Sequence, residues 1–260
     1  YAGQIKLAIS RAKKALDELK ILALGGTAVG TGIGIHPKFS QGVIKELSKM
    51  TNIDFSETDN HFQAQSTIDA VVTASGEIKS IAVSMMKIAN DIRWLGSGPR
   101  AGIGEISLPE VQPGSSIMPG KVNPVIAESV TMVCAQVIGN DSTVTIAGQS
   151  GNFELNVMMP VAAHNLLESI DLLSSSSSNF AEQCIDGLEA TDKGPNMVMQ
   201  GLAICTALAP IVGYDSAAKI AHIASETGKT IKEVTILETD LDEKQIDSIL
   251  EPLSMTEPKE

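Results

Sequence analysis

The sequence predicts an all-α protein, a bundle of long helices followed by a small C-terminal helical domain. Aromatic residues make up 3% of the chain and hydrophobic residues 43%, so the core is expected to consist of Ala, Val, Ile, Leu and Met, which suit packed helices. Apolar residues also recur at three- and four-residue spacings over long stretches. The one long interruption is residues 97–123, whose prolines and glycines predict that neither a helix nor a strand runs through it.

The first half of the chain divides into three expected helical segments. Residues 5–24 have the pattern of an amphipathic helix, and His36-Pro37 opens a short helix that continues through Met50. Residues 60–95 contain no proline and are apolar on more than one face, which predicts a long helix buried among others and an oligomer.

Closely spaced glycines between Leu24 and Gly34 allow three interpretations. The glycines could permit close backbone approach between helices, or they could form part of a small-ligand site. Phosphate binding is disfavoured, because no strand precedes the stretch and the Lys-Ser/Thr ending of a P-loop is missing.

The segment 97–123 is the expected functional loop. A structureless stretch of this length inside a compact domain is usually a lid, a binding loop or disorder, and this one carries too little charge for a disordered tail. We therefore interpret it as a binding loop. Pro124 then restarts a helix whose apolar residues again cover several faces.

The second half is expected to continue as helices, and the serine run 174–178 is interpreted as a solvated helical stretch or a local break rather than a linker. Asp242 is expected near a helix start, and residues 252–260 are expected to be poorly ordered. The expected helices cover 160–173, 196–209 (ended by Pro210), 214–227, 231–237 and 242–250. The predicted domains are 1–196, N-terminally incomplete and carrying the loop, and 197–260.

Charge and cysteine usage exclude several classes of partner and site. The formal net charge of −12 argues against nucleic acid and anionic membranes as partners. The sequence contains no run of 18 apolar residues, so no membrane-spanning helix is predicted. An anionic substrate would need a local positive site. Cys134, Cys184 and Cys205 lie in apolar helical contexts without CxxC spacing, so buried reduced thiols are expected rather than disulfides or metal ligands.

The motif GSSIMPGKVNP, residues 114–124, resembles the signature of the fumarase/aspartase superfamily. That superfamily comprises homotetrameric helical lyases that make or break a bond β to a carboxylate. The resemblance covers essentially the whole chain, and it implies active sites shared between subunits. It is reinforced by GGTAVGTG (25–32), MKIAND (86–91), SGPR (97–100), GNFELN (151–156) and GYD (213–215).

Within the superfamily, the chain resembles class II fumarases. Aspartases commonly have Ala where this chain has Gly120, and a GQLQLN type of segment where it has GNFELN. The resemblance implies reversible hydration of fumarate to (S)-malate through a carbanion (aci-carboxylate) intermediate, without a metal or another cofactor. An aspartate ammonia-lyase is the alternative, because the same loop and the same carbanion could serve it.

The resemblance also implies roles for individual residues. Ser115 corresponds to the catalytic base and Glu128 to the glutamate that hydrogen-bonds a catalytic histidine. Ser116, Lys121, Val122 and Asn123 correspond to substrate-binding positions. These residue types suit the chemistry, since a base must take a proton from carbon while an ammonium and an amide hold the charge that develops.

The catalytic histidine is the difficulty. Family members carry it in a Thr-His motif, and none of His36, His61, His164 and His222 follows a threonine in a matching context. We therefore expect this chain to be the C-terminal part of a longer enzyme and to be inactive alone, with a noncatalytic scaffold as a further alternative. A cytoplasmic location is expected, with the mitochondrial matrix as the alternative.

Overall fold

The computed structural model describes residues 1–98, 100–112, 114, 117–118 and 120–256. These residues form two compact units, one made of 1–95 and 108–188 and the other of 96–107 and 189–260. The expected boundary between residues 196 and 197 stays a prediction. The units are described separately.

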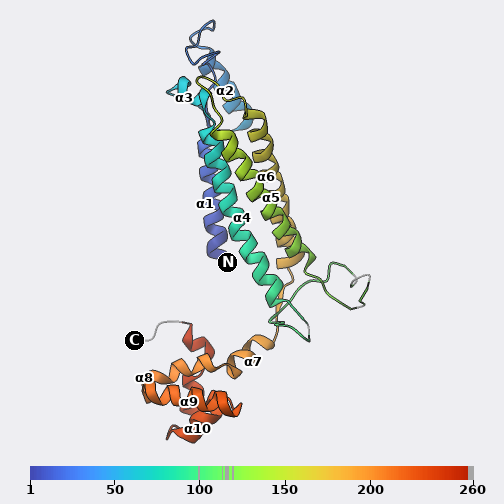
Figure 1. Cartoon of the computed structure of the whole chain (residues 1–260), viewed down its shortest axis with the longest axis vertical. Coiled ribbons are helices and arrows are strands. Elements are labelled where there is room, and N and C mark those ends of the chain that lie inside the picture. The colour runs from blue at the N-terminus through green and yellow to red at the C-terminus, as the bar shows by residue number, and fades with distance from the viewer. Residues whose placement is uncertain (99, 113, 115–116, 119, 257–260) are drawn as a thin grey trace. The chain divides into compact units, whose positions relative to one another are not determined.

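The larger unit is built on long helices. Within the described residues, four helices reach 18 residues or more: α1 (Ala2–Leu19), α4 (Asp69–Leu95), α5 (Val125–Gly148) and α6 (Met159–Phe180). They run side by side with alternating direction, α4 packing against α1 and α5, and α5 against α6 (Figure 1). The predicted all-α fold is confirmed.

Small residues let these helices approach closely. Ala82 and Ala89 of α4 and Ala127 and Ala147 of α5 are fully buried, with no exposed surface. Interior packing is dense, so a larger side chain at such a position would force the helices apart. The serine run belongs to α6, where Ser176 is buried, so the helical interpretation of that run is confirmed.

A buried polar layer joins α5 to both of its neighbours. The carboxylate of Asp141 accepts a hydrogen bond from the Ser75 hydroxyl at 2.8 Å and pairs with the Lys79 ammonium at 2.6 Å. On the preceding residue, the Asn140 amide donates to Glu168 Oε2 at 2.8 Å and to Ser169 Oγ at 3.1 Å. Because buried polar groups need specific partners, this layer determines the alignment of α5 along the helix axes of α4 and α6.

Replacing Asp141 by Ala should destabilise the larger unit. The substitution leaves the buried Ser75 hydroxyl without its acceptor, while Lys79, whose side chain is 43% exposed, can be solvated. We expect a loss of about 2 to 3 kcal/mol in the free energy of unfolding, measured by denaturant titration. Ser142→Ala, at the exposed neighbouring position, is the matched control, and equal stability of the two variants would show that the layer contributes nothing specific.

Short strands and helices close one end of the bundle. β1 (Ile21–Leu22) pairs in parallel with β2 (Ser56–Glu57), and α2 (Phe39–Thr51) and α3 (His61–Ser66) lie between and after them. The predicted helix 5–24 therefore ends early, because its last residues pair as a strand.

Two further helix predictions need correction at this end. The helix expected from His36-Pro37 begins only at Phe39, since residues 36–38 form a turn in which His36 Nδ1 accepts from the Lys38 N–H. The single helix expected over 60–95 is divided into α3 and α4, because Thr67 is extended with φ −119°.

The smaller unit contains the other strand pair. β3 (Ile106–Ser107) pairs antiparallel with β4 (Glu189–Ala190), so the prediction that no strand runs through 97–123 is wrong for these two residues. The prediction of a single helix over 196–209 is also wrong. It is replaced by α7 (Lys193–Gln200), a 3-10 helix (Leu202–Leu208) and α8 (Ala209–Val212), because Gly201 is extended and Pro210 lies in the first turn of α8 rather than at a helix end.

The C-terminal helices follow their predicted positions. They are α9 (Tyr214–Thr227), α10 (Ile231–Glu238) and α11 (Glu243–Ile249), and Thr230 and Asp242 cap the last two with reciprocal side-chain bonds. These helices enclose a core that includes Leu208, Ile220 and Ile246. The 252–260 tail was expected to be poorly ordered, but residues Pro252–Met255 form a 3-10 turn.

All three cysteines are free and buried, which confirms the expected reduced thiols. Burial raises the pKa of each thiol, and that of Cys134 reaches about 11. The folded chain therefore holds these protons more tightly than the unfolded chain, so this contribution to stability is complete below about pH 9 and is lost as the pH rises toward 11.

The thiols should be unreactive in the folded chain. At pH 8 we expect a disulfide exchange reagent such as DTNB to label less than one thiol within minutes, and three in denaturant, because only the thiolate attacks and the folded state suppresses it. Rapid labelling of Cys134 without denaturant would contradict this arrangement.

Among the described residues, no single helix is both long enough and apolar enough to cross a membrane. One pair of consecutive helical segments, Lys193–Gln200 and Leu202–Val212, reaches that length and apolar character only when the two are taken together, and it is bent by 66°.

Candidate active site

Two glycines of the expected functional loop, Gly114 and Gly120, lie close together. Gly114 and Gly120 both have positive φ, +64° and +74°, a conformation that other residues adopt at a cost. A side chain on Gly114 would lie 3.2 Å from the backbone nitrogen of Gly120. Gly114 therefore lies close to Gly120, and a side chain at position 114 would be strained both by the positive φ and by this contact.

The loop leads directly into α5. The Lys121 N–H bonds to the Met118 carbonyl at 3.4 Å, and the Val125 N–H bonds to the Asn123 carbonyl at 2.8 Å. Pro124 is the N-cap of α5, one residue before the position expected for it. Lys121 and Val122 are exposed and Asn123 is partly exposed, so their side chains are open to a ligand.

Glu128 lies in the first turn of α5, where the helix dipole favours a carboxylate. Its Oε1 is 3.8 Å from a guanidinium nitrogen of Arg93 on α4, and another nitrogen of Arg93 donates to Asn90 Oδ1 at 3.1 Å. The Glu128 side chain remains 42% exposed. The Glu128 carboxylate is thus loosely paired with Arg93 and partly exposed to solvent.

The structure brings part of the predicted site together. Lys121, Val122, Asn123 and Glu128 follow one another along the loop end and the first turn of α5. Ser115 and Ser116 lie outside the described residues. Sequence reasoning missed Arg93, although it follows the quoted MKIAND segment by two residues; its ion pair with Glu128 joins positions 35 residues apart and has no local signal.

The glycine-rich stretch near the other end of the bundle is explained by close packing. A side chain on Gly30 would lie 2.9 Å from Phe62 Cα, and one on Gly26 would lie 2.4 Å from Gln65 Oε1. The close approach is thus between this stretch and α3 rather than between two helices, and the small-ligand interpretation stays a prediction.

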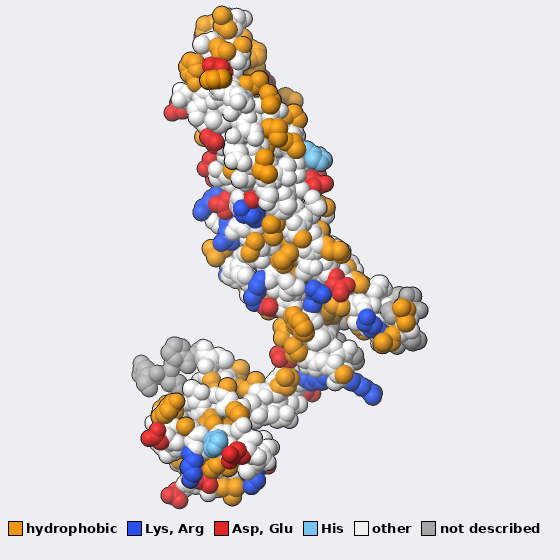
Figure 2. All heavy atoms as spheres, in the orientation of Figure 1, with side chains coloured by type: hydrophobic (Ala, Val, Ile, Leu, Met, Phe, Trp, Pro, Cys, Tyr) orange, Lys and Arg blue, Asp and Glu red, His pale blue; other side chains and the backbone are white. Residues whose placement is uncertain are grey.

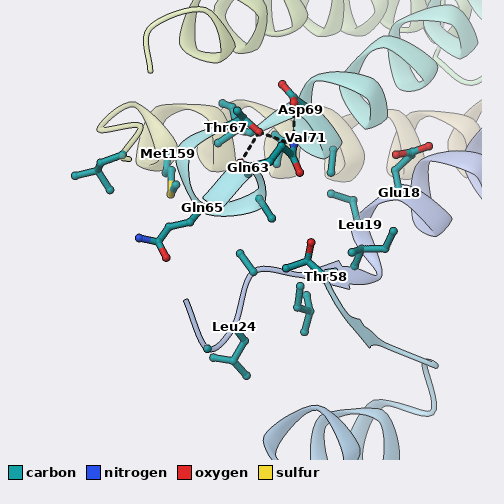
Figure 3. A pocket seen from close by; sticks show the side chains of 18 of the residues that line it. Glu18, Leu19, Leu24, Thr58, Gln63, Gln65, Thr67, Asp69, Val71 and Met159 are labelled. Carbon is teal, nitrogen blue, oxygen red and sulfur yellow. Dashed lines mark hydrogen bonds between the residues drawn. The ribbon is translucent and has the colours of Figure 1, made fainter. Parts of the chain in front are cut away.

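A hollow of about 950 Å³ lies beside this stretch (Figure 3). Gln63 lines the hollow, and its amide donates to Thr67 Oγ1 and to the carboxylate of Asp69. Its charged lining residues among those described are the carboxylates Glu18 and Asp69, without Lys or Arg. This lining is unsuited to phosphate. Likewise, no three His, Cys, Asp or Glu side chains in the described part of the chain gather as metal ligands.

Comparison with known proteins identifies the class. A family model described as "Lyase" matches residues 1–139, and a model described as "Fumarase C C-terminus" matches residues 204–257. The first match covers more than half of the chain, so the chain belongs to the lyase family.

Its similarity within that family is to class II fumarases, as the loop motif predicts. The chain is 48% identical over 99% of its length to "Fumarate hydratase class II 2" of Bradyrhizobium diazoefficiens and 47% identical over 95% to "Fumarate hydratase class II" of Bacillus subtilis. It also superimposes on the crystal structure of the class II fumarase of Schistosoma mansoni with a TM-score of 0.94 and 36% identity over 100% of its length.

The chain spans about half the length of the curated relatives it matches. The matched part is 55% of the Bradyrhizobium protein, 54% of the Bacillus protein and 58% of the Schistosoma chain. Because the C-terminal fumarase model matches residues 204–257, the unmatched part of the relatives lies upstream of the matched part. We call this unmatched part the upstream segment.

Proposed function

We propose that this chain provides part of the active site of a fumarate hydratase, which reversibly hydrates fumarate to (S)-malate. The observation that carries the proposal is the identity of 47–48% with proteins named class II fumarate hydratases over nearly the whole chain. These names favour hydration over the alternative removal of ammonia from aspartate. Family membership also supports a small dicarboxylate as the substrate.

The chemistry assigns the loop a proton transfer from carbon. In the direction of dehydration, Ser115 takes a proton from the carbon next to one carboxylate, and the electron pair left behind forms an aci-carboxylate dianion. The C–O bond on the neighbouring carbon then breaks, the electron pair forms the double bond, and the hydroxyl leaves as water after protonation. Oriented positive charge at the dianion lowers this barrier most.

Lys121 and Asn123 suit that role. An ammonium contributes a point charge to the carboxylate, and an amide adds directional hydrogen bonds to its oxygens. Ser116 and Val122 complete the proposed substrate contacts. A serine hydroxyl is a weak base, so backbone N–H groups of the glycine-bordered turn and the charge of Lys121 would have to stabilise its ionised form.

Glu128 is proposed to orient the imidazole that protonates the leaving hydroxyl. Its partly exposed carboxylate and its position beside Arg93 support this role. The four histidines of this chain are His36, His61, His164 and His222, none in the expected context, so the imidazole must come from the upstream segment or another subunit. The exposure of the loop, with Ile117 at 91% and Met118 at 57%, supports a site completed by further protein surfaces in a homotetramer.

Replacing Glu128 by Gln should reduce turnover without unfolding the protein. The amide keeps the size of the side chain but removes the charge that orients and stabilises the imidazolium. We expect kcat to fall about 10- to 100-fold, because positioning a general acid contributes on this scale. Unchanged kcat at every pH would remove Glu128 from this role, while the exposed Glu226→Gln is the matched control.

The proposed activity is tested by following fumarate absorbance. This chain joined to the upstream segment of a relative, here called the full-length enzyme, should consume fumarate and form (S)-malate, whereas residues 1–260 alone should not. Ammonia release from aspartate by the same preparation would favour the ammonia-lyase alternative. If a folded full-length enzyme catalysed neither reaction, only the scaffold alternative would remain. A cytoplasmic location, with the mitochondrial matrix as the alternative, stays a prediction.

A further inference from the structure

The end of α4 and the start of α5 carry the loop 97–123 between them. α4 and α5 pack against each other, and the chain leaves α4 at Leu95 and enters α5 at Val125. Near these ends, Ala89 of α4 and Ala127 of α5 have no exposed surface, which allows the two helices to approach closely. Side chains next to these alanines therefore project from well-fixed backbone positions.

The side chain of Arg93 joins the two helix ends. One nitrogen of its guanidinium donates to Asn90 Oδ1, one turn earlier in α4, at 3.1 Å. Another nitrogen lies 3.8 Å from Glu128 Oε1 on α5. Because a guanidinium is planar and presents its N–H groups in a fixed fork, the bond to Asn90 also sets the direction of the nitrogen that faces Glu128.

Both charges lie where the helix dipoles favour them. Arg93 is in the last turn of α4, where the free carbonyl groups attract a cation. Glu128 is in the first turn of α5, where the free N–H groups attract an anion. The two helices thus favour the same pairing, across the base of the loop.

This ion pair contributes position rather than stability. The side chains of Arg93 and Glu128 are 39% and 42% exposed, and ion pairs with this exposure stabilise a fold little. Opposite charges are also neighbours elsewhere on the larger unit, as the face in Figure 2 shows. The Arg93 pair differs because it lies between the two ends of the loop and involves the glutamate proposed to orient an imidazole.

We propose that Arg93 is a positioning residue, which holds the Glu128 carboxylate in the orientation that receives the imidazole. This inference rests on the role of Glu128 in the proposed function. A carboxylate accepts hydrogen bonds at two oxygens, so a guanidinium near Oε1 leaves Oε2 to accept from an imidazole N–H. Without Arg93, the partly exposed Glu128 side chain would populate several rotamers, and only some of them would place the carboxylate on the imidazole.

The test is the steady-state kinetics of Arg93→Met in the full-length enzyme. Methionine keeps an unbranched side chain and removes the guanidinium. We expect kcat to fall about 10-fold, as is typical when the partner of a catalytic group is removed, and KM to stay within twofold. Arg93→Lys keeps a positive charge but not the fork, so it should recover part of the loss. It also covers the case in which the methionine variant does not fold.

A double-mutant cycle with Glu128→Gln distinguishes positioning from a structural role. If Arg93 acts through Glu128, then Arg93→Met should lower kcat less than twofold further in an enzyme that already carries Glu128→Gln. Arg11→Met is the matched control, because Arg11 is also a partly exposed arginine on a helix of the bundle, α1. It should leave kcat within twofold in both backgrounds.

Several results would overturn the inference. An equal loss from Arg93→Met with and without Glu128→Gln would show that the two residues act independently. A rise in KM at unchanged kcat would make Arg93 a substrate-binding residue instead. Normal kinetics of Arg93→Met, while Glu128→Gln lowers kcat, would remove the positioning role alone. Normal kinetics of both variants would remove the proposed role of Glu128 as well.

Discussion

Ser115→Ala in the full-length enzyme should reduce kcat for fumarate hydration about 1000-fold, because it removes the group proposed to exchange a proton with carbon. A general base acts on the transition state more than on the bound substrate, so KM should change only a few-fold. Steady-state kinetics from fumarate absorbance measure both quantities. Hydrogen exchange between malate and deuterated water should fall in parallel, because it reports the same proton transfer.

Ser107→Ala is the matched control for this variant. Ser107 lies in the same 97–123 stretch and is exposed, so its removal should leave kcat within twofold. A Ser115→Ala enzyme with normal turnover would exclude the serine as base. The activity of the family would then have to depend on another group.

Lys121→Met should reduce kcat/KM about 100- to 1000-fold. The substitution keeps the length of the side chain and removes the ammonium that meets the substrate carboxylate, an interaction that strengthens as the dianion develops. KM should rise and kcat should fall together, and raising the ionic strength should weaken substrate binding less in the variant than in the wild type. These parameters follow from the same absorbance assay at several salt concentrations.

Lys121→Arg separates charge from geometry, since it should recover part of the loss. Lys38→Met removes one charge at another exposed lysine, and it should leave kcat/KM within twofold if the effect at Lys121 is local. Equal effects of Lys38→Met and Lys121→Met would instead mean that only the overall charge of the protein matters.

The long helices could be predicted because their information is local. The apolar spacing in residues 60–95 and after Pro124 indicates a helix whatever the rest of the fold is. Likewise, α9 begins and ends where predicted. The pairing of Ile106 with Ala190 could not be predicted, because it joins residues far apart through backbone groups that every residue has. The break at Thr67 is likewise invisible to a pattern that continues on both sides.

The candidate site could be proposed from the sequence for a different reason. The order of residues in GSSIMPGKVNP indicates a family, whereas Lys121 or Glu128 alone would be an ordinary surface residue. What this order did not contain is the packing of Arg93 beside Glu128, which depends on how α4 and α5 meet. Nor could it locate an imidazole that the chain does not carry in the expected context.

A structure of the full-length enzyme with bound (S)-malate is the most direct test of the proposed chemistry. The account predicts Ser115 Oγ within about 3.5 Å of the carbon that loses its hydrogen, with Lys121 Nζ beside the adjacent carboxylate. A bound malate whose reacting carbon faces a different residue, with Ser115 directed into bulk solvent, would contradict it.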